Sequence, residues 1–415
     1  MKKFLALIFS SVIALPIFAQ DKALLETLVK KGMLTQQEAT QIAKESVAVV
    51  PVSKATKSIR IYGGVQGWFK WANNDITSGS ANMEEISGFE LRYVKVGFEA
   101  DVGNGWTADI VMDFGSEGDK RNYLDKVVIT KAVDIECFKG KFQIGMRKSE
   151  MGIEQTTDDF KLLAIDRSIA TNFFTRAGNT LAGTSKCFGS RTVGIFWNGE
   201  IPQIEGLHYA LSATSEITEG STSGVINNIN ANSGLSYYVS VGYKNVIEFD
   251  EETLSYDFGL NTGYASKGYT VNNIKNEIWG LNPYVRVKYA NFTAMAEFFY
   301  QDVENGKYAR SSASPTGANV ILAYKFDVAP SIGAIEPVLR FSHVSANSMG
   351  FAVSADNMSY YFNKANTIYL GANWYMTDAI KTSIGYEYGK FSNGSSAQAK
   401  KLESNTILAQ LQVVF

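Results

Sequence analysis

The chain has 415 residues, and its 39 Lys and Arg against 41 Asp and Glu give a formal net charge of −2. This mildly acidic balance provides no bulk attraction to nucleic acid. The 25 Phe, 21 Tyr and 36 Gly against 7 Pro form a composition that favours strands. Beyond the N-terminus there is no run of about 18 apolar residues, the length that a membrane helix requires. A membrane-spanning interpretation therefore requires a closed barrel. A soluble one would require two or three domains, but no linker interrupts the chain after residue 58.

The N-terminus has the pattern of a secretory signal peptide. Lys2 and Lys3 precede an apolar run, and the small residue Ala19 stands just before Gln20 and Asp21. We predict a signal peptide over residues 1–20, and the alternative is a retained anchor helix. Without these residues the chain has 37 basic and 41 acidic residues, a net charge of −4.

Residues 21–57 have the period of helices. Leu24, Leu25 and Leu28 form an apolar stripe, Gly32 fits a helix end, and T-Q-Q-E at residues 35–38 is a capping box that opens a second short helix. We predict a short periplasmic helical segment and linker. The alternative is a short coiled coil or cell-wall contact that helps to assemble an oligomer.

From residue 58 onward, sixteen segments alternate apolar and polar residues with the period of a strand. They lie at 58–71, 89–101, 106–114, 123–132, 141–148, 190–199, 207–215, 235–245, 254–265, 276–289, 291–301, 317–327, 334–344, 366–376, 380–390 and 405–415. Long and short connectors alternate between them, as do the outer loops and periplasmic turns of outer-membrane barrels. We predict an all-β, 16-stranded antiparallel transmembrane β-barrel over residues 58–415. It would lie in the outer membrane of a Gram-negative cell, with both termini in the periplasm.

The longest connector, residues 149–189, is the third of the long loops. A 16-stranded lumen is wider than small ions require, so a discriminating pore needs an element that narrows it. The apolar stretches L-L-A-I and N-F-F favour burial of this loop against the barrel wall. The alternative is a surface loop with solvated charges. Candidate constriction residues are Asp158, Asp159, Lys161, Asp166, Arg167 and Arg176.

Strand parity divides the remaining charged residues between a lipid face and a lumen face. Lys95 and Glu99 fall on the opposite parity from Arg92, which indicates either a bulge near Tyr93 or an error in the register assigned to this strand. A modest basic excess in the lumen favours weak anion preference. Inward carboxylates are Asp109, Asp113, Asp257, Glu297, Glu336 and Glu387. Inward cations, the pore-lining candidates, are Arg60, Lys70, Arg92, Lys126, Lys141, Arg147, Lys244, Arg286, Lys288, Lys325, Arg340 and Lys381.

Four blocks of sequence resemble one family. They are F-E-L-R-Y-V-K-V-G-F-E-A with W-T-A-D-I-V-M-D-F-G in 89–115, K-F-Q-I-G-M-R-K at 141–148, I-D-R-S-I-A-T-N at 165–172, and N-T-I-Y-L-G-A-N-W-Y at 366–375. The chain resembles the phosphate-selective porin O and P family. The resemblance implies a 16-stranded, usually trimeric porin among outer-membrane lipids that passes anions or other small solutes. The arginine ladder and lysine cluster of that family have no residue-by-residue match here, so phosphate is one candidate solute among several.

A hydrolytic barrel is the rival from the class of enzymes. The chain has two histidines, His208 and His343, and nucleophilic catalysis needs a base beside a serine. Ser342 and His343 are strand neighbours that point to opposite faces, so they cannot form a dyad. Two histidines and two distant cysteines do not make a zinc site, and no cofactor-binding motif is present. We therefore predict no enzymatic activity, no metal and no cofactor.

Two further expectations follow from the predicted topology. Cys137 falls in a periplasmic turn and Cys187 at the outer end, roughly 25 Å away across the membrane, so the two should not form a disulfide. A structural or adhesive barrel, with its lumen plugged by loop 149–189, remains an alternative to a porin. A 22-stranded transporter is disfavoured, because residues 21–57 are too short for a plug domain.

Overall fold

In the computed structural model, the described residues are 29–31, 35, 56–76, 85–115, 123–136, 138–175, 191–215, 234–249, 252–271, 274–304, 313–329, 331–346, 351–355, 358–396 and 399–415. The predicted signal peptide, most of segment 21–57, Arg176 and both cysteines lie outside them. Contacts divide the chain into two units, Met1–Ile61 with Phe98–Thr107, and Tyr62–Gly97 with Ala108–Phe415.

The described part of the first unit contains a tight strand connection. Gly103, Asn104 and Gly105 have φ values of 85°, 53° and 74° and form the turn. The Asp101 carboxylate accepts a hydrogen bond from the Gly103 amide at 2.7 Å, which closes this turn.

Most of the described chain is strand. The strands are β1 (Ser58–Ile76), β2 (Ile86–Gly103), β3 (Trp106–Asp113), β4 (Leu124–Ile135), β5 (Phe138–Lys148), β6 (Arg191–Glu200), β7 (Leu207–Ser215), β8 (Leu235–Phe249), β9 (Glu252–Val271), β10 (Ile274–Tyr289), β11 (Phe292–Val303), β12 (Thr316–Tyr324), β13 (Phe326–Ala329), β14 (Gly333–Ser345), β15 (Phe351–Ala355), β16 (Met358–Phe362), β17 (Lys364–Tyr375), β18 (Ile380–Ser396) and β19 (Ala399–Val414). Many extend several residues beyond the predicted segments.

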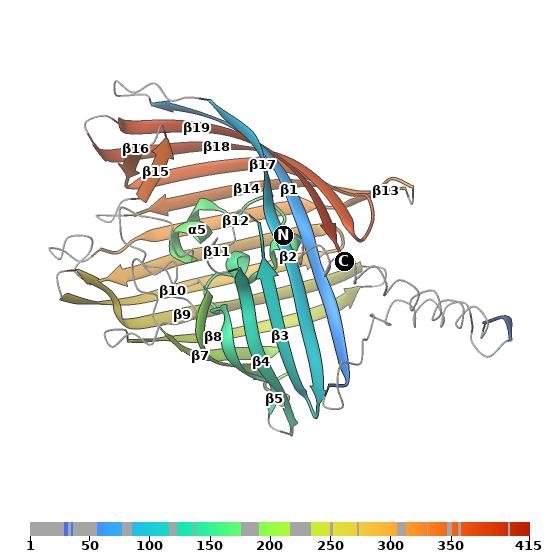
Figure 1. The fold of residues 1–415 in the computed structure, drawn as a ribbon. Helices are drawn as coiled ribbons and strands as arrows, with labels where there is room; N and C mark the ends of the chain where they lie inside the picture. Colours follow the sequence, from blue (N-terminus) through green and yellow to red (C-terminus); the bar gives the residue numbers. More distant parts are fainter. Residues whose placement is uncertain are drawn as a thin grey trace, which may run out of the picture. The chain divides into compact units, whose positions relative to one another are not determined.

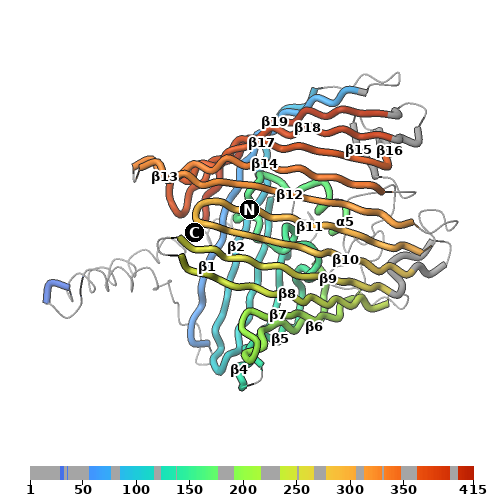
Figure 2. Tube along the Cα trace, turned by 180° about the vertical axis from the view of Figure 1, so that it is seen from behind, coloured from blue at the N-terminus to red at the C-terminus, as the bar shows by residue number. Residues whose placement is uncertain are grey.

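Neighbouring strands in the chain pair with one another, and β1 pairs with both β2 and β19, so the sheet closes on itself. Strands β12 and β13 are separated by Lys325 alone and both pair with β14, so they form one interrupted barrel strand. The predicted 16-stranded antiparallel barrel is thereby confirmed. Figure 1 and Figure 2 show the last strand, β19, running beside β1, with β18 and then β17 next to it. Strands β15 and β16 form a separate hairpin.

Side-chain burial alternates along the strands as the parity argument requires. In β14, Ala334, Val338 and Arg340 are buried on the inner face, whereas Leu339 and Phe341 are exposed on the outer face. An outer face of apolar side chains is what a barrel presents to lipid. The alternation in sequence is therefore the cause of the barrel's two faces.

A bulge interrupts this alternation in β2. Leu91 is 59% exposed, whereas Tyr93 and Lys95 are 6% and 7% exposed, and Arg92 also faces inward over the Trp68 ring at 4.6 Å. Two consecutive inward side chains are the mark of a β-bulge. This burial pattern is the one that a bulge near Tyr93 would produce, and Lys95 lies in the interior.

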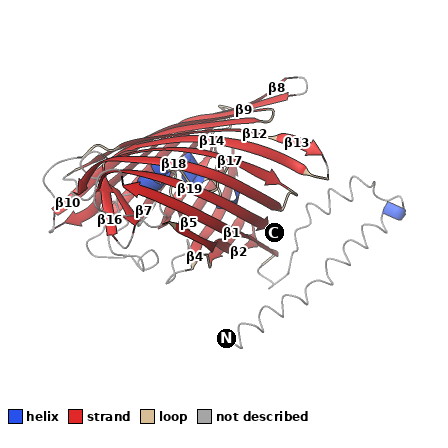
Figure 3. Ribbon diagram, turned by 90° about the horizontal axis from the view of Figure 1, so that it is seen from above, coloured by secondary structure: helices blue, strands red, loops and turns tan. Residues whose placement is uncertain are grey.

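Residues 149–175 of the long connector fold inside the barrel and form α4 (Ile153–Thr156), the 3-10 helix η2 (Asp159–Lys161) and α5 (Ile169–Thr175). Figure 3 shows these helical turns enclosed among the strands. Phe174 is fully buried and stacks on Phe299 of β11, with ring centroids 5.0 Å apart. The apolar part of the loop is therefore packed against the wall, as its sequence indicated.

In the described part of the chain, no helix has both the length and the apolar character needed to cross a membrane.

Candidate constriction and pore lining

Asp159 is the centre of a buried charge cluster where the loop meets one side of the barrel. Its carboxylate forms ion pairs with Lys95 of β2, with Lys148 at 3.4 Å, with Arg167 at 2.5 Å and with Arg191 at 3.9 Å. Burial alone would raise the pKa of Asp159, but the charges of Lys148, Arg167 and Lys95 outweigh it and hold this pKa well below its usual range. The carboxylate is thus ionised and links η2 to β2, β5 and β6.

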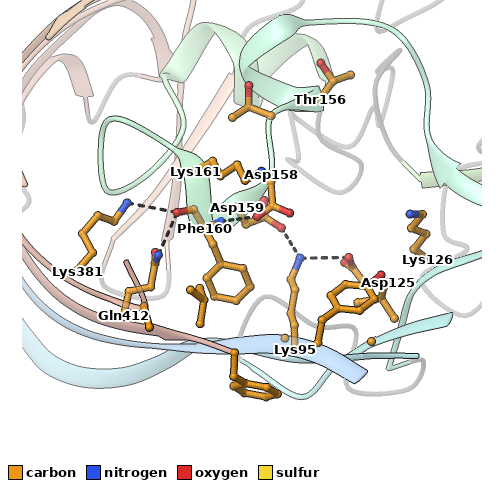
Figure 4. A pocket seen from close by; sticks show the side chains of 18 of the residues that line it. Lys95, Asp125, Lys126, Thr156, Asp158, Asp159, Phe160, Lys161, Lys381 and Gln412 are labelled. Atoms are coloured by element: carbon orange, nitrogen blue, oxygen red, sulfur yellow. Dashed lines mark hydrogen bonds and ion pairs between the residues drawn. The ribbon is translucent and has the colours of Figure 1, made fainter. Parts of the chain in front are cut away.

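Lys95 extends this cluster along the wall. Its ammonium lies 3.1 Å from the Asp125 carboxylate and 4.0 Å from that of Asp113, and Asp125 also pairs with Arg191. Figure 4 shows the Lys95 side chain reaching from the wall to Asp159 of the loop and to Asp125. These alternating charges hold the loop by several bonds at once.

Backbone carbonyls of the loop are held by polar side chains of β1, β18 and β19. Lys381 donates to the carbonyl oxygens of Phe160 and Leu162 at 3.4 and 3.1 Å, and Gln412 donates to that of Phe160 at 3.0 Å. Gln66 donates to the Asp159 carbonyl at 3.1 Å. Figure 4 shows Lys381 and Gln412 converging on Phe160. These donors satisfy carbonyl groups that helix η2 itself leaves unpaired.

On the opposite side, Arg340 of β14 anchors the loop. Its side chain is 2% exposed, lies 3.4 Å from the Glu154 carboxylate, and also binds Glu387 of β18 and the Asp166 carbonyl. Its guanidinium packs over the Tyr369 ring at 5.1 Å. Arg340 faces inward as predicted, but the loop covers it, so it is not open to the lumen.

Glu297 of β11 supports the start of α4. Its carboxylate accepts hydrogen bonds from the Ile153 and Glu154 amides at 2.9 and 3.4 Å, from the Thr171 hydroxyl at 3.2 Å and from Asn282 at 3.3 Å. These amides are the ones that a helix start leaves without a partner inside the helix. A wall carboxylate therefore replaces the usual cap within the loop.

A cavity of about 740 Å³, here called the loop chamber, lies between residues 156–161 and the wall formed by β1 to β6, β18 and β19. Its charged lining comprises seven basic and four acidic side chains, a net charge of +3. Among the described residues, ion pairs engage the other five cations but neither Lys161 nor Lys381. The charged residues are Lys95, Lys126, Arg147, Lys148, Lys161, Arg191, Lys381, Asp125, Asp158, Asp159 and Asp378.

Several predicted lumen cations have carboxylate partners, and others are exposed. Arg60 pairs with Glu99, Lys126 with Asp109 at 2.6 Å, Arg147 with Glu150, Lys244 with Glu200 at 2.5 Å, and Arg286 with Asp257 at 2.8 Å. Arg92 lies 3.4 Å from Asp166, and Lys325 packs over the Tyr375 ring at 4.7 Å. Lys70, Lys141 and Lys288 are exposed.

Within the loop, the predicted constriction residues separate into two groups. Asp159 and Arg167 are buried in the charge cluster, and Asp158, Asp159 and Lys161 line the chamber. Asp166 faces Arg92. Parity and loop length did not single out Asp125, Lys148, Glu154 or Arg191. Each of them lies at a strand end or inside the loop. There the alternation of apolar and polar residues does not extend, so the sequence pattern could not assign them to a face.

The histidines have local partners. His208 lies 3.1 Å from Asp257, and His343 bonds to Asn366 at 2.8 Å, while Ser342 bonds to the Ala318 carbonyl. Ser342 and His343 thus engage different partners, as their strand positions require. Within the described residues, no group of three or more potential ligands is placed to hold a metal ion.

Comparison with known proteins decides the family. The profile of the phosphate-selective porin O and P family matches residues 60–415. The chain belongs to this family. It is an outer-membrane porin of the Gram-negative type, a channel rather than an enzyme by family membership. Among curated proteins, none matches its sequence.

Solved porins share the fold at low sequence identity. OprB of Pseudomonas putida has a TM-score of 0.60 and 11% identity, covering 86% of this porin and 94% of its own chain. The anion-selective porin from Comamonas acidovorans has a TM-score of 0.56 and 13% identity, and the match covers 86% of this porin and 99% of the Comamonas chain. The outer membrane channel DcaP of Acinetobacter baumannii has a TM-score of 0.55 and 12% identity, and the match covers 88% of this porin and 100% of the DcaP chain.

Proposed function

We propose that this porin prefers anions and that loop 149–189 forms its constriction through residues 149–175. The observation that carries the proposal is the loop chamber, where seven basic side chains face four acidic ones. Lys161 is exposed there and forms no ion pair among the described residues, whereas Lys381 is buried and donates to two carbonyl oxygens of the loop. In a narrow site with low-dielectric walls, an uncompensated positive charge lowers the barrier for anions and raises it for cations.

Two roles divide the candidate residues. Arg340, Asp159 and Arg167 are buried and hold the loop in place. The pore-lining role falls to side chains that line the interior of the barrel, among which Lys161 is exposed at the loop chamber and Lys381 lines it as a buried residue. The remaining pore-lining residues are Arg60, Lys70, Arg92, Lys126, Arg147, Lys244, Arg286, Lys288 and Lys325, most of which a carboxylate partly neutralises.

This neutralisation favours a weak, general anion preference over phosphate specificity. A phosphate-selective pore needs several cations in line that exchange the ion's hydration for charge-assisted hydrogen bonds. Here the clustered cations are engaged by Asp125 and Asp159. The similarity in fold to the anion-selective porin from Comamonas acidovorans supports anion passage but does not identify the anion.

The wider setting follows from the family and the sequence pattern. We propose that residues 1–20 are removed as a signal peptide, that residues 21–57 form a periplasmic helical segment, and that the mature porin is a homotrimer in outer-membrane lipid with both termini in the periplasm. The rival function, a plugged structural or adhesive barrel, is disfavoured by the open volume of the loop chamber.

Planar-bilayer recording of the purified full chain under a potassium chloride gradient tests the proposal. We expect discrete conductance steps and a reversal potential shifted from zero toward the equilibrium potential of chloride. A shift toward the equilibrium potential of potassium would refute the anion preference. Silence across preparations whose folding is verified by circular dichroism would instead favour the plugged barrel.

A further inference from the structure

The loop chamber combines a net positive lining with an apolar surface that is unusual for a porin lumen. Val111 of β3 and Val414 of β19 lie on the inner face and line it. The rings of Tyr62, Phe160 and Tyr375 line it as well. In most barrels the side chains that face the water channel are polar. The chamber is therefore amphipathic.

The aromatic and cationic parts of the chamber touch. The Lys381 ammonium lies 5.9 Å from the centre of the Tyr375 ring, and it also donates to the carbonyl oxygen of Phe160 at 3.4 Å. Lys161 follows Phe160 directly in the chain and lines the same cavity. An anion bound at these lysines would thus have aromatic surface within reach of its uncharged part.

We propose that the loop chamber is a binding site for amphipathic organic anions, namely carboxylates that carry a hydrocarbon or aromatic group. This inference rests on the proposed anion preference and names the class of solute. Lys161, which is exposed and has no ion pair among the described residues, supplies the attraction for a single carboxylate, and the charge of the nearby Lys381 adds to it. The valine and aromatic side chains remove the apolar group from water.

Inorganic phosphate fits this chamber less well than such a carboxylate. Phosphate has no apolar surface to bury, and it loses its strong hydration only where several hydrogen-bond donors replace it. Five of the chamber's seven cations already have carboxylate partners among the described residues. The chamber therefore offers few free donors to phosphate but a large apolar contact to an organic anion.

Block of the chloride current in planar bilayers tests the inference, with the full chain and three probes: phenylacetate, acetate and inorganic phosphate. Phenylacetate and acetate carry the same charge and differ by a phenyl ring. We expect phenylacetate to reduce the chloride conductance by half at an about fivefold lower concentration than acetate, because partial burial of the ring adds apolar contact. Phosphate should block less well than phenylacetate.

Matched variants separate the two parts of the site. Lys161→Gln should weaken block by phenylacetate and acetate alike, whereas Lys364→Gln, at an exposed position at the start of β17 outside the chamber, should leave both unchanged. Val111→Thr and Phe160→Leu should reduce the difference between the concentrations of phenylacetate and acetate that block the current by half. Val128→Thr, at a buried inner-face position of β4 outside the chamber, is their control.

The outcomes distinguish this inference from the proposed function. A chloride-selective channel that acetate and phenylacetate block equally, or that phosphate blocks best, would overturn the inference and leave the anion preference intact. A cation-selective channel would overturn the anion preference itself. The ratio of the acetate to the phenylacetate concentration that halves the conductance should fall in Val111→Thr and in Phe160→Leu. If it is unchanged in both variants while their conductance is normal, the assignment to this chamber is overturned as well.

Discussion

The two sides of the inward loop are held in different ways. Toward β10 to β14, the loop is packed tightly: Phe174 stacks on Phe299, and Arg340 and Glu297 are almost fully buried. Toward β1 to β6, the loop is held mainly by polar contacts, with the cluster around Asp159 at their centre, and the loop chamber opens beside it. Cations at inner-face strand positions therefore anchor the loop on the β10 to β14 side of the barrel, whereas on the β1 to β6 side some of them face the chamber.

The largest effect should come from removing the anchor on the packed side. Arg340→Met leaves the Glu154 and Glu387 carboxylates without their shared cation. Breaking a buried ion pair by removing one partner costs about 3–5 kcal/mol. We expect a correspondingly lower free energy of unfolding, measured by denaturant titration in detergent, and a noisier conductance as the loop detaches. An unchanged unfolding midpoint would contradict the anchoring role.

Replacing Asp159 tests how the loop is anchored on the side of the chamber. Asp159→Asn removes the negative charge that joins Lys95, Lys148 and Arg167. These three cations and the nearby Arg191 would then repel one another, so we expect the loop to loosen while the barrel stays folded. Limited proteolysis should cut the loop faster than in the wild type, and open-channel noise should increase. Equal cleavage rates in both proteins would show that the cluster does not hold the loop.

The pH dependence of loop attachment follows from the lowered pKa of Asp159. A carboxyl whose folded-state pKa lies below its unfolded value contributes stability above about pH 3.9, and loses it only as pH falls through the lower folded value. Loop attachment should therefore be unchanged from pH 7 to about pH 4 and weaken at more acidic pH. Conductance noise recorded across this range measures it. A transition near pH 6 that Asp159→Asn removes would contradict this assignment.

Strand periodicity predicted the face of each side chain but not its environment. Arg286 and Arg340 both occupy inner positions of their strands, yet the side chains are 50% and 2% exposed. The difference arises because α4 and α5 cover β14, and no local pattern in β14 records where a distant loop will pack. Lys95 is the opposite case, since its off-parity position itself indicated the bulge that turns it inward.

A smaller effect is expected inside the chamber. Lys161→Glu lowers the net charge of the charged lining from +3 to +1. A unit charge about 4 Å away in water is worth about 1 kcal/mol, so the chloride-to-potassium permeability ratio should fall by roughly two- to fivefold. The reversal potential in a potassium chloride gradient measures this ratio. Lys70→Glu is the matched control outside the chamber, and an equal shift there would mean that the chamber does not dominate selectivity.

The smallest effect should come from Arg286→Gln, which completes the comparison with Arg340. Arg286 pairs with Asp257 at 2.8 Å, but its side chain is half exposed and His208 also faces Asp257 at 3.1 Å. Exposed ion pairs contribute about 0–1 kcal/mol, since water and salt screen them. We expect an unfolding midpoint and a reversal potential close to those of the wild type. A loss as large as that of Arg340→Met would mean that inner-face parity, rather than cover by the loop, determines how much an arginine stabilises this barrel.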